Sequence, residues 1–506
     1  MFKPIDFLLD RITMYRLLLY YLIALLAIAA GLGFAGVLHY NGLAIIFSAS
    51  YLTLICWITH EVFARAFEAP ANIESSLITA LILALIITPY KDSHDILFMT
   101  AAAGLAISSK YILQIRHQHI FNPAAVAVAL TAIGPGQIAS WWVGSSQMLP
   151  YVAIGGLLLI RKIQRGQMVT TFVATAIASQ AIVSILGHHN LGANLKQELL
   201  HSSLWFLAFV MLTEPSTSPG SNVKRSWYAG LVGALFPPQV HIFGIFSTPE
   251  RALLIGNIFS YIVSPKTKLL LRLKQKEVIA KGTMEFVFGL NRPLDFKPGQ
   301  YMEFTLPHHG MDSRGSRRYF TLASSPTENE LHLGVKFYAN GSSFKHAMRA
   351  MESQTMFGAA QLGGDFVLPA DQNQKLAFIA GGIGVTPFRS MLKYLADKAE
   401  KRDVALLYSE RTADRLAYKA VFTEAEEKVG AKVIYTLTDE HSLPANWGGA
   451  TGFISDQMIE QAIPDFGERL FYISGPQPMV EATKSVLHKM GVPRHKIRTD
   501  FFPGYA

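Results

Sequence analysis

The sequence predicts a multi-domain protein: an all-α polytopic membrane bundle of about ten helices, then an antiparallel β-barrel, then an α/β domain with a parallel sheet. Of its 506 residues, 50% are hydrophobic and only 16% are charged, whereas soluble domains average roughly a quarter. Long apolar runs are confined to residues 1–264, and charged residues become frequent from residue 265 onward. There, strand patterns alternate first with turns and then with helix patterns. We therefore expect three domains, at 1–264, 265–370 and 371–506.

Residues 1–264 contain apolar segments that we expect to form the membrane helices. Several are shorter than the ~20 residues that cross a bilayer perpendicularly, as occurs where helices break near the midplane to line a site. Shallow hairpins that do not cross the bilayer are the alternative. The ten segments are 17–38, 43–64, 73–89, 95–109, 121–134, 148–161, 168–187, 202–213, 227–247 and 250–264.

The basic residues of this half indicate its orientation. If the N-terminus lies in the cytoplasm, the outer loops receive only Lys91, Lys196 and Arg251 among the basic residues. Because positively charged loops stay inside, we expect a multi-pass protein of the inner (cytoplasmic) membrane with residues 265–506 in the cytoplasm. We accordingly assign the net charge of +9 to the membrane and expect no nucleic-acid partner. The sequence does not indicate the oligomeric state.

Ligands for metal cofactors are scarce. The single cysteine, Cys56, excludes a cysteine-ligated iron–sulfur cluster within this chain. Heme groups that carry electrons across a membrane need histidine pairs stacked along helices. Here His60 and His201 lie close to the bodies of apolar segments, and neither has a partner on its own segment. We expect neither heme nor another metal site.

The stretch RRYFTLASSP, Arg317–Pro326, combines groups that suit a flavin dinucleotide. Arg318 can neutralise a pyrophosphate, Phe320 can form an apolar wall beside the isoalloxazine ring, and Thr321 can supply a hydroxyl near its N5 atom. By itself, such a stretch is more often a strand with an exposed arginine. NGSSF, at 340–344, adds a tight turn that can present backbone amides to a phosphate.

Two glycine-containing stretches end strands of the α/β half. AGGIGVTP, at 380–387, ends one strand and begins a helix whose N-terminus favours an anion. YISGPQPMV, at 472–480, ends the last expected strand at the carboxyl edge of the sheet, where open α/β sheets bind nucleotides. Neither stretch is the G-x-G-x-x-G fingerprint. A plain strand–helix turn is the alternative for each glycine pair.

These four motifs, in this order, resemble those of the ferredoxin–NADP reductase superfamily. RYFT matches its flavin motif, with Phe320 where tyrosine is commoner, and GSS matches its second pyrophosphate motif. GGIGVTP and SGPQPM match its two nicotinamide-nucleotide motifs, with Ser474 where many members have cysteine. The resemblance implies FAD in the barrel, NAD(P)H in the α/β domain and hydride transfer from nicotinamide to flavin, with Thr321, Ser474 and Tyr505 at the reacting atoms. The cofactor-binding residues that it implies are Arg318, Tyr319, Phe320, Thr321, Ser324, Gly341, Ser342, Ser343, Gly381, Gly382, Gly384, Thr386, Pro387, Gly475, Pro476, Met479, Phe502 and Tyr505.

The choice of nucleotide and the role of the tail stay open at this stage. In YSERTADRLAY, Ser409 and Arg411 can hold the 2′-phosphate of NADPH. We slightly favour NADPH over NADH because the arginine guanidinium is always charged and binds phosphate through two hydrogen bonds. Glu410 can instead repel that phosphate or bind a ribose hydroxyl, as acids do for NADH. In the tail FFPGY, Phe502 or Tyr505 can shield the flavin face or simply pack on the barrel.

Two motifs of the membrane half place polar residues at the ends of apolar segments. HIFNPAAVAV contains Asn122 before a helix-breaking proline, and MLTEPSTSP contains Thr213 and Glu214. Helix capping can explain both. In this order, however, they are similar to motifs of the NqrB/RnfD family, the ten-helix flavin-bearing subunits of the sodium-pumping NADH:quinone reductase and the Rnf complex.

The chain departs from that family in one respect. The family carries FMN covalently on a threonine of a Ser/Thr-Gly-Ala-Thr motif in a long outer loop, whereas the loop at 134–147 is short here. The Gly-Ala-Thr at 449–451 lies in the cytoplasmic half, where we expect a turn. Covalent FMN is therefore not expected, and a non-covalent FMN or riboflavin, or a quinone, near Asn122 and Thr213 is the hypothesis that we carry forward.

These observations predict an NAD(P)H-dependent FAD oxidoreductase that passes electrons from cytoplasmic NAD(P)H through FAD into the membrane half. There a quinone, a second flavin or an outer-face acceptor receives them. The alternatives are a redox-driven Na⁺ pump, a heme-free ferric or flavin reductase, and a transporter whose flavin domain senses redox state.

Overall fold

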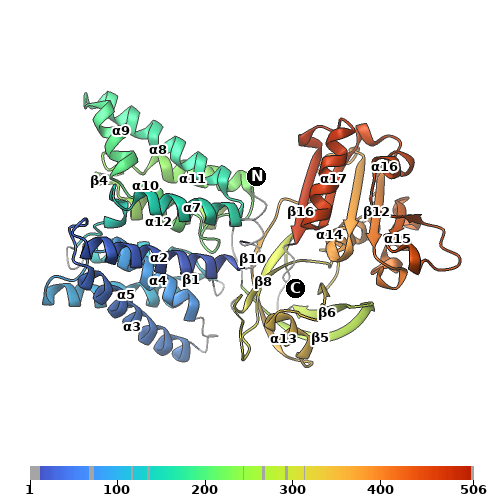
Figure 1. The fold of residues 1–506 in the computed structure, drawn as a ribbon, viewed down its shortest axis with the longest axis horizontal. Coiled ribbons are helices and arrows are strands. Elements are labelled where there is room, and N and C mark those ends of the chain that lie inside the picture. Colours follow the sequence, from blue (N-terminus) through green and yellow to red (C-terminus); the bar gives the residue numbers. More distant parts are fainter. Residues whose placement is uncertain are drawn as a thin grey trace. The chain divides into compact units, whose positions relative to one another are not determined.

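The computed structural model forms two compact units, residues 1–267 and residues 268–506. It describes residues 9, 12–67, 73–115, 118–133, 137–242, 244–264, 268–290, 294–312 and 314–502. The first unit is helical, blue to green in Figure 1, and the second holds two sheets, yellow to red. The domain boundary predicted at 370, inside the second unit, stays a prediction.

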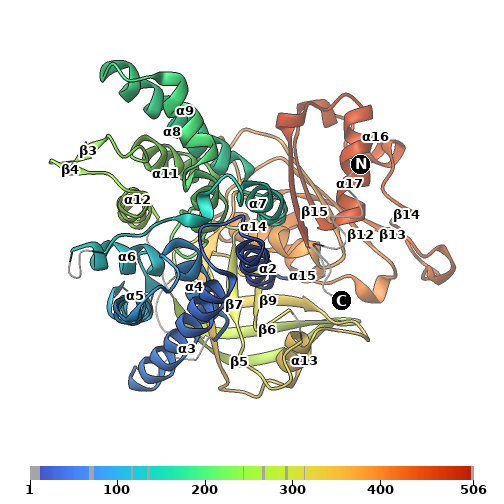
Figure 2. The same ribbon diagram turned by 60° about the vertical axis from the view of Figure 1, so that its left-hand side comes forward.

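Each of the ten predicted apolar segments overlaps a helix of the first unit. A further helix, α9 (Leu191–Leu200), was not predicted because its sequence, LGANLKQELL, is too polar to read as an apolar run. Figure 2 shows α8 and α11 side by side, and the two helices pack against each other. The other helices are α2 (Met14–Phe34), α3 (Gly42–Ala66), α4 (Ile73–Ile86), α5 (Ser93–Ile112), α6 (Pro123–Ile133), α7 (Leu149–Ile163), α8 (Gly166–Leu186), α10 (Leu204–Phe206), α11 (Asn222–Ala234) and α12 (Pro249–Val263).

Four helices of the described residues are long and apolar enough to cross a membrane: α2, α3, α5 and α8. The apolar helices α4 and α6 are shorter. Helix α4 is buried along nearly all its length between its neighbours, as an all-round apolar helix must be, while α3 exposes large apolar side chains such as Leu54 and Val62. These features indicate a membrane region, and the number of ten membrane-spanning helices stays a prediction.

Two of the predicted segments differ in detail from the structure. The segment at 202–213 forms the short α10 and then a π-helical turn, η2 (Leu207–Met211), directly before Thr213. The segment at 227–247 stays helical only to Ala234, because Pro237 and Pro238 cannot continue a helix. A small hairpin follows, formed by β3 (His241–Ile242) and β4 (Ile245–Phe246).

The second unit begins with an antiparallel six-stranded sheet of order β8-β7-β10-β5-β6-β9. Its apolar side chains alternate along the strands and form one core with Phe344 and Met348 of α13 (Ser343–Ala350). The edge strands are β8 and β9, and Ala323 N–H, just beyond β8, donates to His332 O of β9 at 2.9 Å. The antiparallel sheet is confirmed, and its closure into a barrel stays a prediction. The strands are β5 (Leu269–Ala280), β6 (Thr283–Leu290), β7 (Tyr301–Thr305), β8 (Arg317–Thr321), β9 (Glu330–Lys336) and β10 (Met356–Gly363).

A parallel six-stranded sheet of order β14-β13-β12-β11-β15-β16 follows, as predicted. Helices α14 (Thr386–Asp397) and α15 (Lys419–Val429) share a core with one of its faces. Helices α16 (Asp456–Ala462) and α17 (Gln477–Lys489) share a core with the other. This two-sided cover explains why strands such as LAFIAG are apolar throughout. The strands are β11 (Leu376–Gly381), β12 (Val404–Glu410), β13 (Lys432–Leu437), β14 (Ala450–Thr451), β15 (Leu470–Pro476) and β16 (Ile497–Phe502).

Two predictions for this sheet were wrong. The Gly-Ala-Thr at 449–451 is not a turn, because Ala450 and Thr451 form edge strand β14 beside β13. Strand β15, which contains Ser474, is not the last of the sheet, because β16 pairs with it in parallel, Ser474 opposite Asp500. Both strands were missed because β14 is very short and β16 mixes charged and apolar residues.

Candidate functional site

The two nucleotide motifs meet at the carboxyl edge of the parallel sheet. Strands β11 and β15 are neighbours, so the turn after Gly381 lies beside Ser474. A side chain at Gly384 would lie 2.4 Å from Ser474 O, so glycine is required for this close approach. Thr386 and Pro387 begin α14, whose N-terminal amides point to this edge. Gly475 and Pro476 end β15, and Met479 of α17 lies against Gly381 and Gly475.

Gly382 lies at the centre of this turn and has a positive φ of 58°. A side chain there would meet Lys336 Nζ at 3.3 Å and Glu410 Oε1 at 3.5 Å. Lys336 of β9 donates to Glu410 of β12 at 2.7 Å, and its side chain is 12% exposed against 5% for Glu410. The glycine turn therefore borders a largely buried ion pair between the two sheets of this unit, and Lys336 was not identified from the sequence.

The flavin motif forms strand β8 and the residues that follow it. Arg318 is buried, and its guanidinium donates to Arg314 O at 2.8 Å and lies 5.1 Å from the Phe344 ring of α13. The Phe320 ring also lies 6.0 Å from Phe344. Tyr319 is more exposed and donates to Gln361 Oε1 at 2.9 Å. Thr321 is buried at the end of the strand.

The GSS motif lies at the start of α13. Its Gly341 closes a turn with Tyr338, whereas Ser342 caps the helix and Ser343 is the first helical residue. The predicted tight turn is therefore correct for Gly341 but not for Ser343.

A carboxylate already binds to this helix N-terminus. Ser343 N–H donates to Asp312 Oδ2 at 3.1 Å, and Arg318 Nη2 lies 3.8 Å from Asp312 Oδ1. Burial opposes the ionisation of Asp312, but N–H donors from Arg314 and Ser343 lower the pKa of its carboxyl group below the ordinary value. Since carboxylates and phosphates bind helix N-termini in the same way, this place accepts an anion.

Positive charge is concentrated around the same helix end. Burial, and then the charges of Arg318 and Arg314, lower the pKa of Lys345 to about 8. A pyrophosphate would relieve this crowding of cations, so the residues present fit the dinucleotide that the sequence predicts. Arg314, Asp312 and Lys345 were not predicted, although the density of charge in MDSRGSRR was a signal.

Two buried serine hydroxyls near the motifs lack a hydrogen-bond partner among the described residues. They are Ser324 Oγ, three residues after the flavin strand, and Ser474 Oγ, on the nucleotide edge. Buried hydroxyls are normally bonded, so their lack of a partner suits groups that meet a ligand. Phe502 ends β16, its side chain lies outside the described residues, and so does Tyr505.

The residues predicted for the 2′-phosphate lie at the end of β12. Ser409 is buried in register with Gly381 of β11. Arg411 is 68% exposed, and its Nε lies 3.4 Å from Asp439 Oδ2. Asp439 follows the neighbouring strand β13 and was not identified from the sequence.

In the membrane unit, the two polar motifs meet at one partly buried carboxylate, that of Glu214. Asn122 Nδ2 donates to Glu214 Oε2 at 2.8 Å, and His119 Nε2 lies 3.7 Å from Glu214 Oε1. Asn122 Oδ1 also accepts Ala125 N–H at the start of α6, so the predicted cap is present as well. Thr213 turns its hydroxyl to Phe209 O within its own helix and does not reach this carboxylate.

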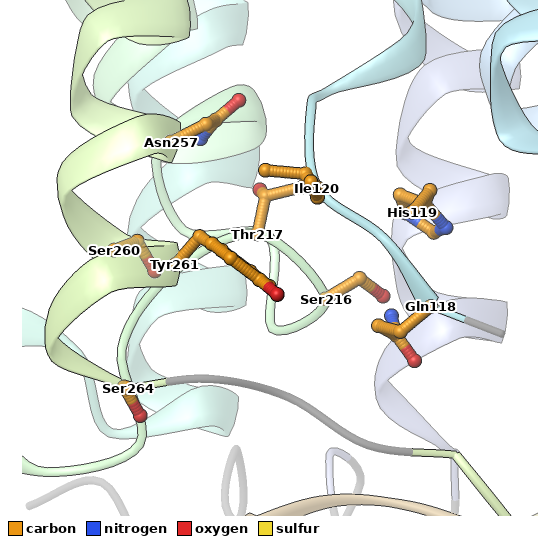
Figure 3. Close-up of a pocket in the computed structure, with 9 residues that line it drawn as sticks. All are labelled: Gln118, His119, Ile120, Ser216, Thr217, Asn257, Ser260, Tyr261 and Ser264. Carbon is orange, nitrogen blue, oxygen red and sulfur yellow. The ribbon is translucent and has the colours of Figure 1, made fainter. Parts of the chain in front are cut away.

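A small polar pocket opens beside this cluster, where Asn257 of α12 accepts Asn122 N–H at 2.8 Å (Figure 3). It has room for about one water molecule, so a ring-sized ligand would need side chains to move. Figure 3 shows Asn257, Ser260 and Tyr261 of α12 opposite residues 118–120 and 216–217. The lining residues are Gln118, His119, Ile120, Ser216, Thr217, Asn257, Ser260, Tyr261 and Ser264.

Three family models match successive parts of the chain. Residues 143–267 match the NQR2, RnfD, RnfE family, a range that includes MLTEPSTSP but not HIFNPAAVAV. Residues 270–358 match an oxidoreductase FAD-binding domain, and residues 378–485 match an oxidoreductase NAD-binding domain.

Characterised relatives match over the second unit. The glycine betaine monooxygenase reductase subunit of Pseudomonas aeruginosa is 26% identical over 223 residues, which cover 43% of this chain and 59% of that protein. NADH-cytochrome b5 reductase 1 of Ajellomyces capsulatus is 26% identical over 282 residues, 53% of this chain and 86% of that protein. The chain thus spans about three fifths of the first relative's length.

Among solved structures, the cytochrome P450 reductase GcoB of Amycolatopsis aligns with a TM-score of 0.43 and 24% identity, over 47% of this chain and 72% of that one. The FAD/NAD-binding domain of nitric oxide dioxygenase from Vibrio cholerae aligns with a TM-score of 0.42 and 21% identity, over 46% of this chain and 98% of that one. By its family matches, this chain is a region of the NQR2, RnfD, RnfE family fused to the FAD-binding and NAD-binding domains of an NAD(P)H-dependent flavin oxidoreductase.

Proposed function

We propose that this protein takes electrons from cytoplasmic NAD(P)H and passes them through FAD to an acceptor in its membrane half. The acceptor is a quinone or a non-covalently bound flavin such as FMN or riboflavin. The N-terminus and the second unit lie in the cytoplasm, as the distribution of basic residues predicts.

On the reductase side, the chain's own residues have distinct tasks. Arg318, Lys345 and the N-terminus of α13 hold the pyrophosphate of FAD, and the glycine turn with α14 holds that of the nucleotide. We assign the hydroxyls of Thr321 and Ser474 to the reacting atoms, and Tyr505 or Phe502 to the shielding of the flavin. FAD, when bound, supplies the conversion of a two-electron donor into single electrons.

The observation that carries the membrane part of the proposal is the hydrogen bond between Asn122 and Glu214. Two motifs distant in sequence converge there on one carboxylate, next to a polar pocket. Polar groups in a bilayer are costly and usually mark a site. An anchor would need a single helix and no such cluster.

The test compares the full protein in liposomes with a fragment that begins at Lys268, where the second compact unit starts. Nicotinamide nucleotide should bleach the flavin absorbance of both. Added quinone should then reoxidise the flavin of the full protein much faster than that of the fragment. Equal rates for the two would mean that the helical unit is only an anchor.

The same liposomes distinguish electron transfer to a membrane acceptor from the alternative functions, an ion pump and a redox sensor. A turnover rate that rises with Na⁺ concentration would support an ion pump, and nucleotide binding without turnover would support a redox sensor. Pigment analysis of the purified protein measures whether a second, non-covalent flavin is present beside FAD.

A further inference from the structure

We propose that the electron donor is NADH, and that Asp439 is the residue that selects it over NADPH. The inference rests on the proposed function, because it concerns the nucleotide that reduces the flavin. It replaces the slight preference for NADPH that the sequence suggested from Ser409 and Arg411.

The order of the parallel sheet indicates where the adenosine ribose lies. The glycine turn after β11 and the N-terminus of α14 receive the pyrophosphate. Strand β12 is the neighbour of β11, and β13 is the neighbour of β12. In open α/β sheets, ligands bind outside the carboxyl ends of the strands, and we place the ribose over the ends of β12 and β13.

The chain segments that follow β12 and β13 are joined by backbone hydrogen bonds. Thr438 N–H donates to Glu410 O at 3.0 Å, and Asp439 N–H donates to Arg411 O at 3.1 Å. These backbone bonds keep the side chains of Arg411 and Asp439 opposite each other, with Nε and Oδ2 3.4 Å apart. The backbone therefore keeps residues 411 and 439 within reach of each other.

Two cations at this edge already face carboxylates. Lys336 is bound to Glu410 at 2.7 Å, and the other Glu410 oxygen accepts Arg411 N–H at 3.0 Å. Arg411 faces Asp439, so the two cations are balanced by two carboxylates. A phosphate adds a charge of about −1.5 to −2, which here would meet Asp439.

Asp439 suits a ribose hydroxyl in the same position. Its side chain is 20% exposed, and the described residues offer no hydrogen bond to its Oδ1 atom. A carboxylate oxygen accepts a hydrogen bond from the 2′-hydroxyl of NADH. The selecting acid thus follows β13, whereas the acid at the end of β12, Glu410, is already held by Lys336.

The experiment uses the full-length protein with bound FAD and measures ferricyanide reduction at low ionic strength with NADH and with NADPH. We expect kcat/KM for NADH to exceed that for NADPH about tenfold to hundredfold, the range of one charge-assisted hydrogen bond. Asp439→Asn should lower this ratio by a similar factor through the two KM values, with little change in kcat. In Asp439→Asn, Arg411 no longer faces a carboxylate and can bind the 2′-phosphate of NADPH. The double variant that also carries Arg411→Ala should therefore lose the gain in kcat/KM for NADPH.

The matched control is Glu440→Gln, which removes the same charge from the next residue, an exposed one. It should leave the ratio nearly unchanged, and FAD content measured for each variant reports correct folding. A wild-type preference for NADPH, or an equal shift in Glu440→Gln, would overturn the assignment to Asp439. Failure of both nucleotides to reduce the flavin would instead refute the proposed function, so the two failures are distinguishable.

Discussion

Arg389 of α14 and Glu328, in the segment that follows β8, form an ion pair through two hydrogen bonds. Arg389 Nη2 donates to Glu328 Oε1 at 2.9 Å, and Nη1 donates to Ala323 O at 3.0 Å. The next residue, Ser390, donates to Ser324 O at 2.6 Å. Because Arg389 belongs to α14 and residues 323–328 follow β8, these bonds set the distance between the two cofactor motifs.

We expect Arg389→Lys to slow flavin reduction while FAD stays bound. Lysine keeps the charge but loses the planar fork, so the two motifs are held less firmly. Stopped-flow bleaching of the flavin by nucleotide measures the rate. The control is Arg469→Lys, an equally buried arginine that forks onto Asp465 within the parallel-sheet half. An equal loss of rate in both variants would contradict a specific role for Arg389.

Arg318→Ala should weaken FAD retention, because it removes a buried cation from the helix end that accepts an anion. A charge-assisted bond contributes about 1.5–3 kcal/mol, or roughly tenfold to hundredfold in Kd. The FAD content after extensive dialysis checks this. Stoichiometric FAD in the dialysed variant would show that Arg318 does not hold the pyrophosphate.

FAD binding should depend on pH through Lys345. Its folded-state pKa is lowered to about 8 from the ordinary 10.5, so its charge is a cost to the fold below pH 8. Between pH 8 and 10.5 the unfolded chain binds more protons, so stability rises with pH in that window. A bound pyrophosphate favours the charged lysine, so the affinity for FAD should instead fall as pH rises through about 8.

Titration of the flavin-free protein with FAD between pH 7 and 9.5 measures this effect. Lys345→Met should flatten the profile, whereas Lys393→Met, which changes a lysine paired with Asp397 on α14, should leave it unchanged. A profile that stays steep without Lys345 would assign the dependence to another group.

In the membrane half, Asn122→Ala should slow electron delivery to quinone without affecting flavin reduction by the nucleotide. The variant deprives Glu214 of its amide donor at 2.8 Å. Thr213→Val should have a smaller effect, because the Thr213 hydroxyl donates to Phe209 O and does not reach Glu214. Quinone-dependent reoxidation in liposomes measures both, and unchanged rates in Asn122→Ala would remove the role of this cluster.

The sequence by itself determined the division into a helical apolar half and a two-sheet half, the position of most strands and helices, and the four cofactor motifs. All of these are carried by local patterns: the length of an apolar run, the alternation along a strand, or a glycine where a side chain cannot fit. Strands β14 and β16 were not predicted from the sequence, because β14 is very short and β16 lacks a clear apolar pattern.

Only the tertiary structure decided which side chains meet. Asp312 at the start of α13, Glu214 beside Asn122, and Asp439 opposite Arg411 are each brought to their partners by the packing of separate elements. No periodic pattern in the sequence predicts such pairs, because the sequence around a loop carboxylate does not indicate whether the carboxylate faces solvent or a cation. The arginine that suggested NADPH from the sequence is for this reason interpreted differently once its neighbour on β13 is known.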